Sequence, residues 1–129
     1  MIVLDASAAI ELLITSQRAA AVREAIGNER MQAPHLLDIE VAQVLRRFRA
    51  RGALTESDVE LAVEDLLQMR IQRHAHLALL PRIRELSDNA TAYDACYLAL
   101  AEELDAVLVT CDAKMSRVAG SRARTLVLA

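Results

Sequence analysis

Residues 91–112 read TAYDACYLALAEELDAVLVTCD and carry the clearest indication of the fold. Thr91 to Leu104 repeats its apolar residues at helical spacing, which predicts a helix with one inward face. Ala106 to Thr110 is continuously apolar without alternation, which is typical of a strand covered on both faces. A helix followed directly by such a strand indicates an α/β protein.

The same alternation of strand and helix continues on both sides of this stretch. We expect further strands at Ile2 to Leu4, Met31 to Ala33, Ile71 to Leu77 and Leu126 to Leu128. We expect further helices at Ser7 to Thr15, Arg18 to Ile26, Leu36 to Arg51 and Thr55 to Gln68, and a short helix or turn near Ala113 to Val118. This order predicts a three-layer α/β/α sandwich with a mostly parallel central sheet.

The composition fits one compact unit in a reducing compartment. The chain has 129 residues, close to the most common domain size, so we expect residues 1–129 to form a single domain. Cys96 and Cys111 do not have the spacing of zinc ligands, which favours a cytoplasmic setting. There is no apolar run of roughly 18 residues and no basic start typical of a secretory signal, so we expect no membrane segment.

Four carboxylates are expected to meet at one edge of the predicted sheet: Asp5, Glu40, Asp94 and Asp112. Asp5 ends the first strand, and Asp112 follows the strand that closes at Thr110, so both lie at the carboxyl ends of strands. Glu40 and Asp94 lie near the starts of their helices. Because these helices run antiparallel to the strands, their amino ends lie at the same edge.

The two helical acids interrupt apolar faces. Glu40 shares a face with Leu37 and Val44, and Asp94 shares one with Tyr97. A partly buried carboxylate is unfavourable unless it is paired, protonated or bound to a metal. No Lys or Arg is adjacent in the sequence to Asp5, Glu40 or Asp94, so cations from solution are the simplest neutraliser. Oxygen ligands without His or Cys select Mg²⁺ or Mn²⁺, and two such ions about 4 Å apart can activate water for phosphodiester hydrolysis.

Four segments together resemble the PIN-domain ribonucleases, and in particular the VapC-type toxins of bacterial toxin–antitoxin pairs. They are Val3 to Ser7, Leu36 to Val41, Thr91 to Ala101 and Leu108 to Asp112, and they span most of the chain in order. The resemblance implies an endoribonuclease that depends on Mg²⁺ or Mn²⁺, cuts RNA with a metal-activated water and slows translation. It also implies a homodimer and a cognate antitoxin that covers the acidic groove.

The resemblance also assigns roles to individual residues. It implies that Asp5, Glu40, Asp94 and Asp112 bind the metal and form the catalytic site. It implies that the hydroxyls of Ser7 and Thr110 lie near the metal and orient a ligand or a water. Asp5, Ser7 and Asp112 can also be explained as helix caps, because Asp and Ser side chains accept hydrogen bonds from free N–H groups at helix starts.

Basic residues offer two candidate surfaces for RNA phosphates. Arg46, Arg47, Arg49 and Arg51 form a run on the helix that carries Glu40, although a solvated helix face explains them equally well. Lys114, Arg117, Arg122 and Arg124 form the second candidate. The formal net charge of −3 argues against binding by bulk positive charge, and scarce aromatics favour recognition by shape and phosphate over base stacking.

Other functions remain as alternatives at this point. A PIN-domain nuclease can process RNA without an antitoxin, and the same fold without catalysis would be a binding module. A magnesium-binding receiver domain has a similar size, but it requires adjacent acids after the first strand, whereas Asp5 is followed by Ala6 and Ser7. A phosphatase of the Asp-x-Asp type fails at Ser7 for the same reason.

Overall fold

The computed structural model describes residues 1–128, and these form one sheet of five parallel strands. The strands are β1 (Ile2–Leu4), β2 (Met31–Pro34), β3 (Ile71–His74), β4 (Val107–Thr110) and β5 (Thr125–Val127). Their order across the sheet is β3-β2-β1-β4-β5, and each neighbouring pair is parallel. The expected parallel sheet is therefore confirmed.

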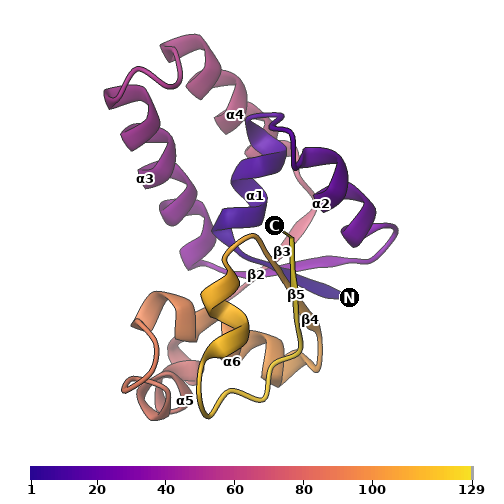
Figure 1. The fold of residues 1–129 in the computed structure, drawn as a ribbon, viewed down its shortest axis with the longest axis vertical. Coiled ribbons are helices and arrows are strands. Elements are labelled where there is room, and N and C mark those ends of the chain that lie inside the picture. Colours follow the sequence, from indigo (N-terminus) through magenta and orange to yellow (C-terminus); the bar gives the residue numbers. More distant parts are fainter. Residues whose placement is uncertain (129) are drawn as a thin grey trace.

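Helices cover both faces of the sheet, which confirms the three-layer sandwich. They are α1 (Ala6–Leu13), α2 (Ala19–Ile26), α3 (Leu36–Ala50), α4 (Glu56–Gln68), α5 (Leu80–Glu85) and α6 (Ala92–Leu104), with short 3₁₀ turns η1 (Leu77–Leu79) and η2 (Ala113–Arg117). In Figure 1 the helices α1 to α4 lie above the sheet, and α5 and α6 lie below it. Within residues 1–128, no helix has the length and apolar composition needed to cross a membrane.

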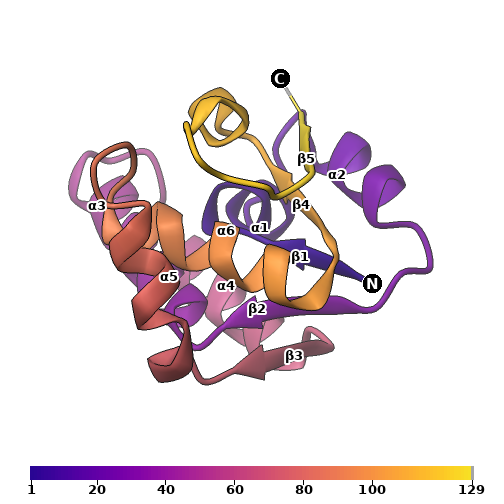
Figure 2. The same cartoon turned by 90° about the horizontal axis from the view of Figure 1, so that it is seen from below.

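The core lies between the central strands and the helices α1, α3 and α6. All side chains of β1, and those of β4 from Leu108 to Thr110, are buried, as their apolar sequences indicated. Figure 2 shows α6 crossing the sheet beside β1, and every residue from Ala95 to Ala101 is buried there. On α3, Leu37, Val41 and Leu45 form a buried stripe at four-residue spacing.

The boundaries differ from the predictions in several places. The third strand ends at His74 instead of continuing to Leu77, because the chain turns into η1 and then α5. We did not predict α5, which has only six residues and is too short to show a helical period. Smaller shifts affect α1, which begins at Ala6 because Asp5 caps it, and β5, which begins one residue earlier than predicted, at Thr125.

The strand order fixes where a site can form. The chain builds the sheet outward from β1 to β2 and β3, and then returns to place β4 on the other side of β1. Such a reversal leaves a crevice at the carboxyl ends of the two strands that flank it, which is where ligands bind in open α/β sheets. Asp5 follows β1 and Asp112 follows β4. A receiver domain has the order 2-1-3-4-5, so this topology excludes it.

Candidate functional site

Asp5 is held rigidly at the start of the crevice. It is 5% exposed, and its Oδ1 accepts hydrogen bonds from the Ala8 backbone N–H at 3.0 Å and from the Ser7 hydroxyl at 2.6 Å. Asp5 is therefore the N-cap of α1, as one interpretation of the sequence predicted. Burial raises the pKa of Asp5 above its ordinary value of 3.8, although the hydrogen bonds from Ser7, Thr110 and Ala8 lower it.

Thr110 connects two of the acids through one buried hydroxyl. Its Oγ1 donates to Oδ2 of Asp5 at 2.5 Å and accepts the backbone N–H of Asp112 at 3.0 Å. The Ser7 hydroxyl lies 3.2 Å from the Thr110 hydroxyl and accepts the backbone N–H of Cys111 at 2.9 Å. These contacts fix the segment after β4 against the end of β1, and they place both predicted hydroxyls beside the acids.

Glu40 approaches the crevice from α3 and is partly buried near the Tyr97 hydroxyl of α6. Burial raises the pKa of Glu40 above its ordinary value of 4.5, the nearby Tyr97 hydroxyl lowers it by a smaller amount, and the charges of Asp94 and Asp5 raise it again. Within residues 1–128, Glu40 Oε1 and the Tyr97 hydroxyl oxygen are both buried without a hydrogen-bond partner. A buried carboxylate oxygen in this state requires a proton or a cation.

Asp94 and Asp112 face a common cation, the ammonium group of Lys114. Asp94 lies in the first turn of α6, where its backbone N–H donates to the N-cap Thr91 at 3.1 Å. Asp112 caps η2 by accepting the Lys114 backbone N–H at 3.1 Å. Lys114 Nζ lies 3.3 Å from Asp94 Oδ2 and 3.5 Å from Asp112 Oδ2. The charge of Asp94, and then that of Asp112, raise the pKa of Lys114, so it stays protonated.

The four acids reach one edge, but their oxygens do not form a finished metal site. The charge of Asp112 raises the pKa of Asp5, and the charges of Asp94 and Asp5 raise that of Glu40, so the acids are within electrostatic reach of one another. In the part of the chain that the structure describes, no three His, Cys, Asp or Glu side chains are placed closely enough to hold a metal. The donors still fit Mg²⁺ or Mn²⁺, because all are carboxylates and Glu40 has an unpaired oxygen.

The predicted basic surfaces are only partly free to bind a ligand. Arg49 pairs with Glu56, whereas Arg46 and Arg47 form no ion pair within residues 1–128. Arg122 and Arg124 pair with acids at the carboxyl end of α6, far along that helix from Asp94. Arg46 and Arg47 are therefore the better candidates among the residues predicted to bind RNA.

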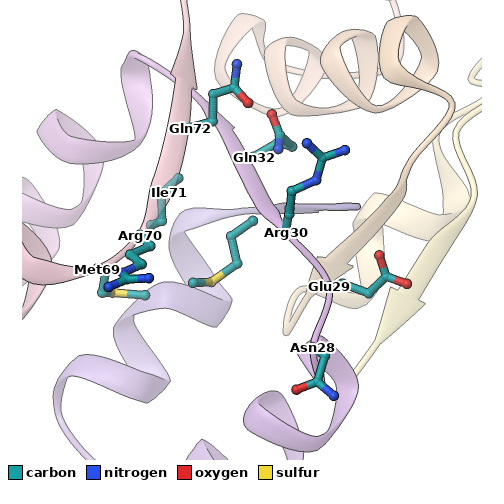
Figure 3. A pocket seen from close by; sticks show the side chains of 9 residues that line it. Asn28, Glu29, Arg30, Gln32, Met69, Arg70, Ile71 and Gln72 are labelled. Carbon is teal, nitrogen blue, oxygen red and sulfur yellow. The ribbon is translucent and has the colours of Figure 1, made fainter.

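Two hollows lie in different parts of the molecule. One of about 630 Å³ lies at the amino ends of β2 and β3, where Arg30, Met69, Arg70 and Gln72 line it, and it contains none of the four acids (Figure 3). The other, of about 450 Å³, lies between α3 and the start of α6 and includes Glu40 in its wall. Arg47, which forms no ion pair within residues 1–128, also lines the second hollow. This hollow therefore extends from Glu40 at the acidic edge to an unpaired guanidinium group.

Two residues of the site were not predicted as such. Tyr97 was assigned only to the inward face of its helix, and Lys114 only to a basic surface. A signal for Lys114 was present, because it is the only lysine in the chain and lies two residues after Asp112. Nothing in the sequence alone marked the Tyr97 hydroxyl as facing Glu40.

The fold and the acidic edge define a class of small α/β proteins with a carboxylate cluster at the point where the strand order reverses. Residues 2–121 match the PIN domain family. The chain therefore belongs to the PIN-domain family, as the segments around Asp5 and Asp94 indicated. VapC ribonuclease Mb0985 from Mycobacterium bovis is 41% identical over 90% of this chain and 89% of its own length. Ribonuclease VapC12 from Mycobacterium tuberculosis is 33% identical over the full length of both chains.

Solved structures share this fold. VapC20 from Mycobacterium tuberculosis, described as a sarcin-ricin loop cleaving toxin, superposes with a TM-score of 0.71 at 13% identity and covers 96% of this chain and 99% of its own. VapBC2 from Rickettsia felis, bound to a DNA fragment from its promoter, gives a TM-score of 0.67 at 13% identity, with 97% and 98% covered. These similarities confirm the predicted α/β sandwich.

Proposed function

We propose that this chain is a VapC-type toxin, an endoribonuclease that hydrolyses RNA with Mg²⁺ or Mn²⁺ bound by Asp5, Glu40, Asp94 and Asp112. The observation that carries the proposal is the convergence of these acids, from separate segments, on the crevice between β1 and β4. The ribonuclease names of its relatives support RNA as the substrate. A bound ion supplies a water of lowered pKa and neutralises charge on the phosphate.

The surrounding residues hold these acids in place before substrate binds. Asp5 is fixed by three donors, which limits its movement to small displacements. Thr110 transmits that position to the Asp112 backbone, so the two strand-end acids keep their spacing. The Tyr97 hydroxyl stays neutral, since burial raises its pKa, and its O–H is able to donate a hydrogen bond to Glu40. Such preorganisation lowers the energy needed to assemble a catalytic site.

Arg46 and Arg47 are proposed to hold RNA phosphates beside the acids. The hollow of about 450 Å³ runs from Glu40 to Arg47 along α3, which gives the RNA backbone a path away from the crevice. Arginine suits this role because its planar guanidinium matches phosphate oxygens in two directions. Arg49 contributes less to this path, because Glu56 already pairs with it.

We further infer a cognate antitoxin, a second copy of the chain and a cytoplasmic location. The relatives of the VapC class support the antitoxin. Exposed apolar side chains at Ile39, Leu77 and Leu80 offer area for contact between copies. A PIN-domain nuclease that processes RNA without an antitoxin remains the second candidate. Growth arrest on expression in a bacterial host, relieved by a protein encoded next to this one, would distinguish the toxin from that candidate.

The catalytic proposal is tested by RNA cleavage with purified wild type, Asp5→Asn and Asp94→Asn. Both variants should lose activity by at least about 100-fold, because even residues that only support metal ligands cost 10–100-fold. Asp105→Asn is the matched control, since Asp105 ends the same helix as Asp94 but lies at its other end and has a left-handed backbone that Asn tolerates. Cleavage should require Mg²⁺ or Mn²⁺ and stop in EDTA. Equal activity in all four proteins would refute the proposed site.

A further inference from the structure

Lys114 stands apart from the other basic residues of the chain. It is the only lysine among 15 Lys and Arg residues, and it lies in η2, directly after the strand-end acid Asp112. Arg122 and Arg124 pair with other acids, and Arg46, Arg47, Arg49 and Arg51 lie along α3 or at its end. The only lysine ammonium group of the chain therefore lies at its acidic edge.

The contacts of Lys114 are those of a cation shared by two ligands. Its Nζ lies 3.3 Å from Asp94 Oδ2 and 3.5 Å from Asp112 Oδ2, so a single charge bridges a helix start and a strand end. Asp112 also accepts the Lys114 backbone N–H, which fixes where the side chain begins. The charged end is thus held between the acids, while its base is fixed to one of them.

The Lys114 side chain can also leave this position at little cost. It is 63% exposed and extends from a single 3₁₀ turn. Exposed ion pairs of this kind contribute little stability, and a flexible four-carbon stem lets the ammonium swing into solvent. A divalent ion that takes Asp94 and Asp112 as ligands carries more charge, and the two cations repel each other at such short distances.

We propose that Lys114 is a tethered counter-ion, which occupies the cation position between Asp94 and Asp112 until a divalent ion displaces it. The inference rests on the proposed function, because it takes Asp94 and Asp112 as metal ligands. It goes further in making metal binding an exchange: the ammonium leaves as the ion enters. Lys114 thereby holds the two acids in place without metal and weakens the affinity for the ion.

The exchange can be observed directly because the chain has one lysine. Protein labelled with ¹³C at lysine Cε gives a single side-chain NMR signal, which reports Lys114 alone. Titration of the full-length wild type with Mg²⁺ in the absence of RNA should move this signal along a saturable curve to the position of a free, mobile lysine. A Lys114 signal that stays fixed while Mg²⁺ shifts the backbone signals of Asp94 and Asp112 would overturn the inference and leave the metal site standing. No Mg²⁺ binding at those residues would overturn both.

Matched variants measure how strongly Lys114 competes with Mg²⁺ for Asp94 and Asp112. Lys114→Met should bind Mg²⁺ about two- to thirtyfold more tightly in calorimetry, which is the range that two surface ion pairs represent. Arg117→Met removes a positive charge from the same turn without touching either acid, and Lys114→Arg keeps the charge, so both should bind Mg²⁺ as the wild type does. Unchanged or weaker Mg²⁺ binding by Lys114→Met, or an equal gain in Arg117→Met, would show that Lys114 does not compete for the site.

Discussion

At the scale of single residues, the buried hydroxyl of Thr110 gives the sharpest test of how the acids are held. Thr110→Val keeps the shape of the side chain and removes both the donor to Asp5 and the acceptor for the Asp112 N–H. The free energy of unfolding should fall by about 1–3 kcal/mol, because buried partners lose their hydrogen bonds. RNA cleavage should fall by about 10–100-fold, as expected for loss of a group that orients metal ligands.

Thr110→Ser separates these effects in the same assays. It keeps the hydroxyl and loses one buried methyl group, so it should lose about 1 kcal/mol of stability and retain most of the cleavage activity. Urea unfolding and initial cleavage rates measure the two quantities. If Thr110→Val cleaves RNA as fast as Thr110→Ser, the hydroxyl does not position the acids.

Single residues also show what the sequence could reveal about the site. The places of Asp5 and Asp94 at the acidic edge could be predicted, because Asp5 follows a buried strand and Asp94 lies in the first turn of a helix. The pairing of Lys114 with Asp94 could not, because it depends on how η2 packs against the start of α6. The buried Glu40 oxygen without a hydrogen-bond partner lies near Tyr97, which is on a different helix. Residue types and periodicity carry no information on such pairs.

At the scale of elements, a guanidinium group connects α5, α6 and the segment before β5. Arg82 donates from Nε and Nη2 to the two oxygens of Glu102 at 2.8 and 3.1 Å, and from Nη2 to the Gly120 carbonyl at 2.6 Å. The Glu102 side chain is only 8% exposed. Burial raises the pKa of Glu102, but the hydrogen bonds from Arg82 and from the Arg122 backbone N–H together lower it by more. The pKa is therefore below its ordinary value, and the acid is charged.

Arg82→Met should therefore lower the free energy of unfolding by about 1.5–3 kcal/mol, the range for hydrogen bonds to charged groups. Glu102→Gln and the double variant complete a thermodynamic cycle in urea unfolding. A coupling energy of at least about 1 kcal/mol is expected. Independent, additive losses would mean that this pair does not hold the elements together.

The length and composition of each element decide whether it could be predicted from the sequence. A long helix such as α3 has enough turns to show an apolar period, and the buried strands β1 and β4 have characteristic compositions. The sequence alone predicts that Glu102 lies on a solvated helix face, because its partner Arg82 is on α5, which was not predicted. Short elements held by distant ion pairs leave no periodic signal.

At the scale of the whole molecule, the parallel sheet and its acidic edge could be predicted, while the strand order could not. Alternating strands and helices fix the direction of each strand, and so fix which ends gather together. They do not determine that β4 returns to the far side of β1. The reversal places Asp5 and Asp112 at one crevice, and it brings several carboxylates close together, of which Asp5 is buried and Glu40 is partly buried.

That crowding should appear as a pH dependence of stability. The pKa of Glu40 is raised in the folded protein, so the folded state binds its proton more tightly than the unfolded state does. The resulting stability is complete below the ordinary pKa of 4.5 and is lost as the pH rises through the raised value. In EDTA, Glu40→Gln should therefore gain stability relative to the wild type between pH 4 and pH 8, measured by urea unfolding.

Asp58→Asn should show the opposite pH dependence of stability in the same experiment. The backbone and hydroxyl of Thr55 lower the pKa of Asp58 in the capping box of α4, so its stabilising contribution is lost as the pH falls. Asp58→Asn should lose stability relative to the wild type as the pH rises.

Saturating Mg²⁺ should remove the stability advantage of Glu40→Gln, because the ion binds the charged Glu40 carboxylate and stabilises the wild type. A Glu40→Gln difference that does not change with pH would mean that burial of this acid is not a strain on the fold.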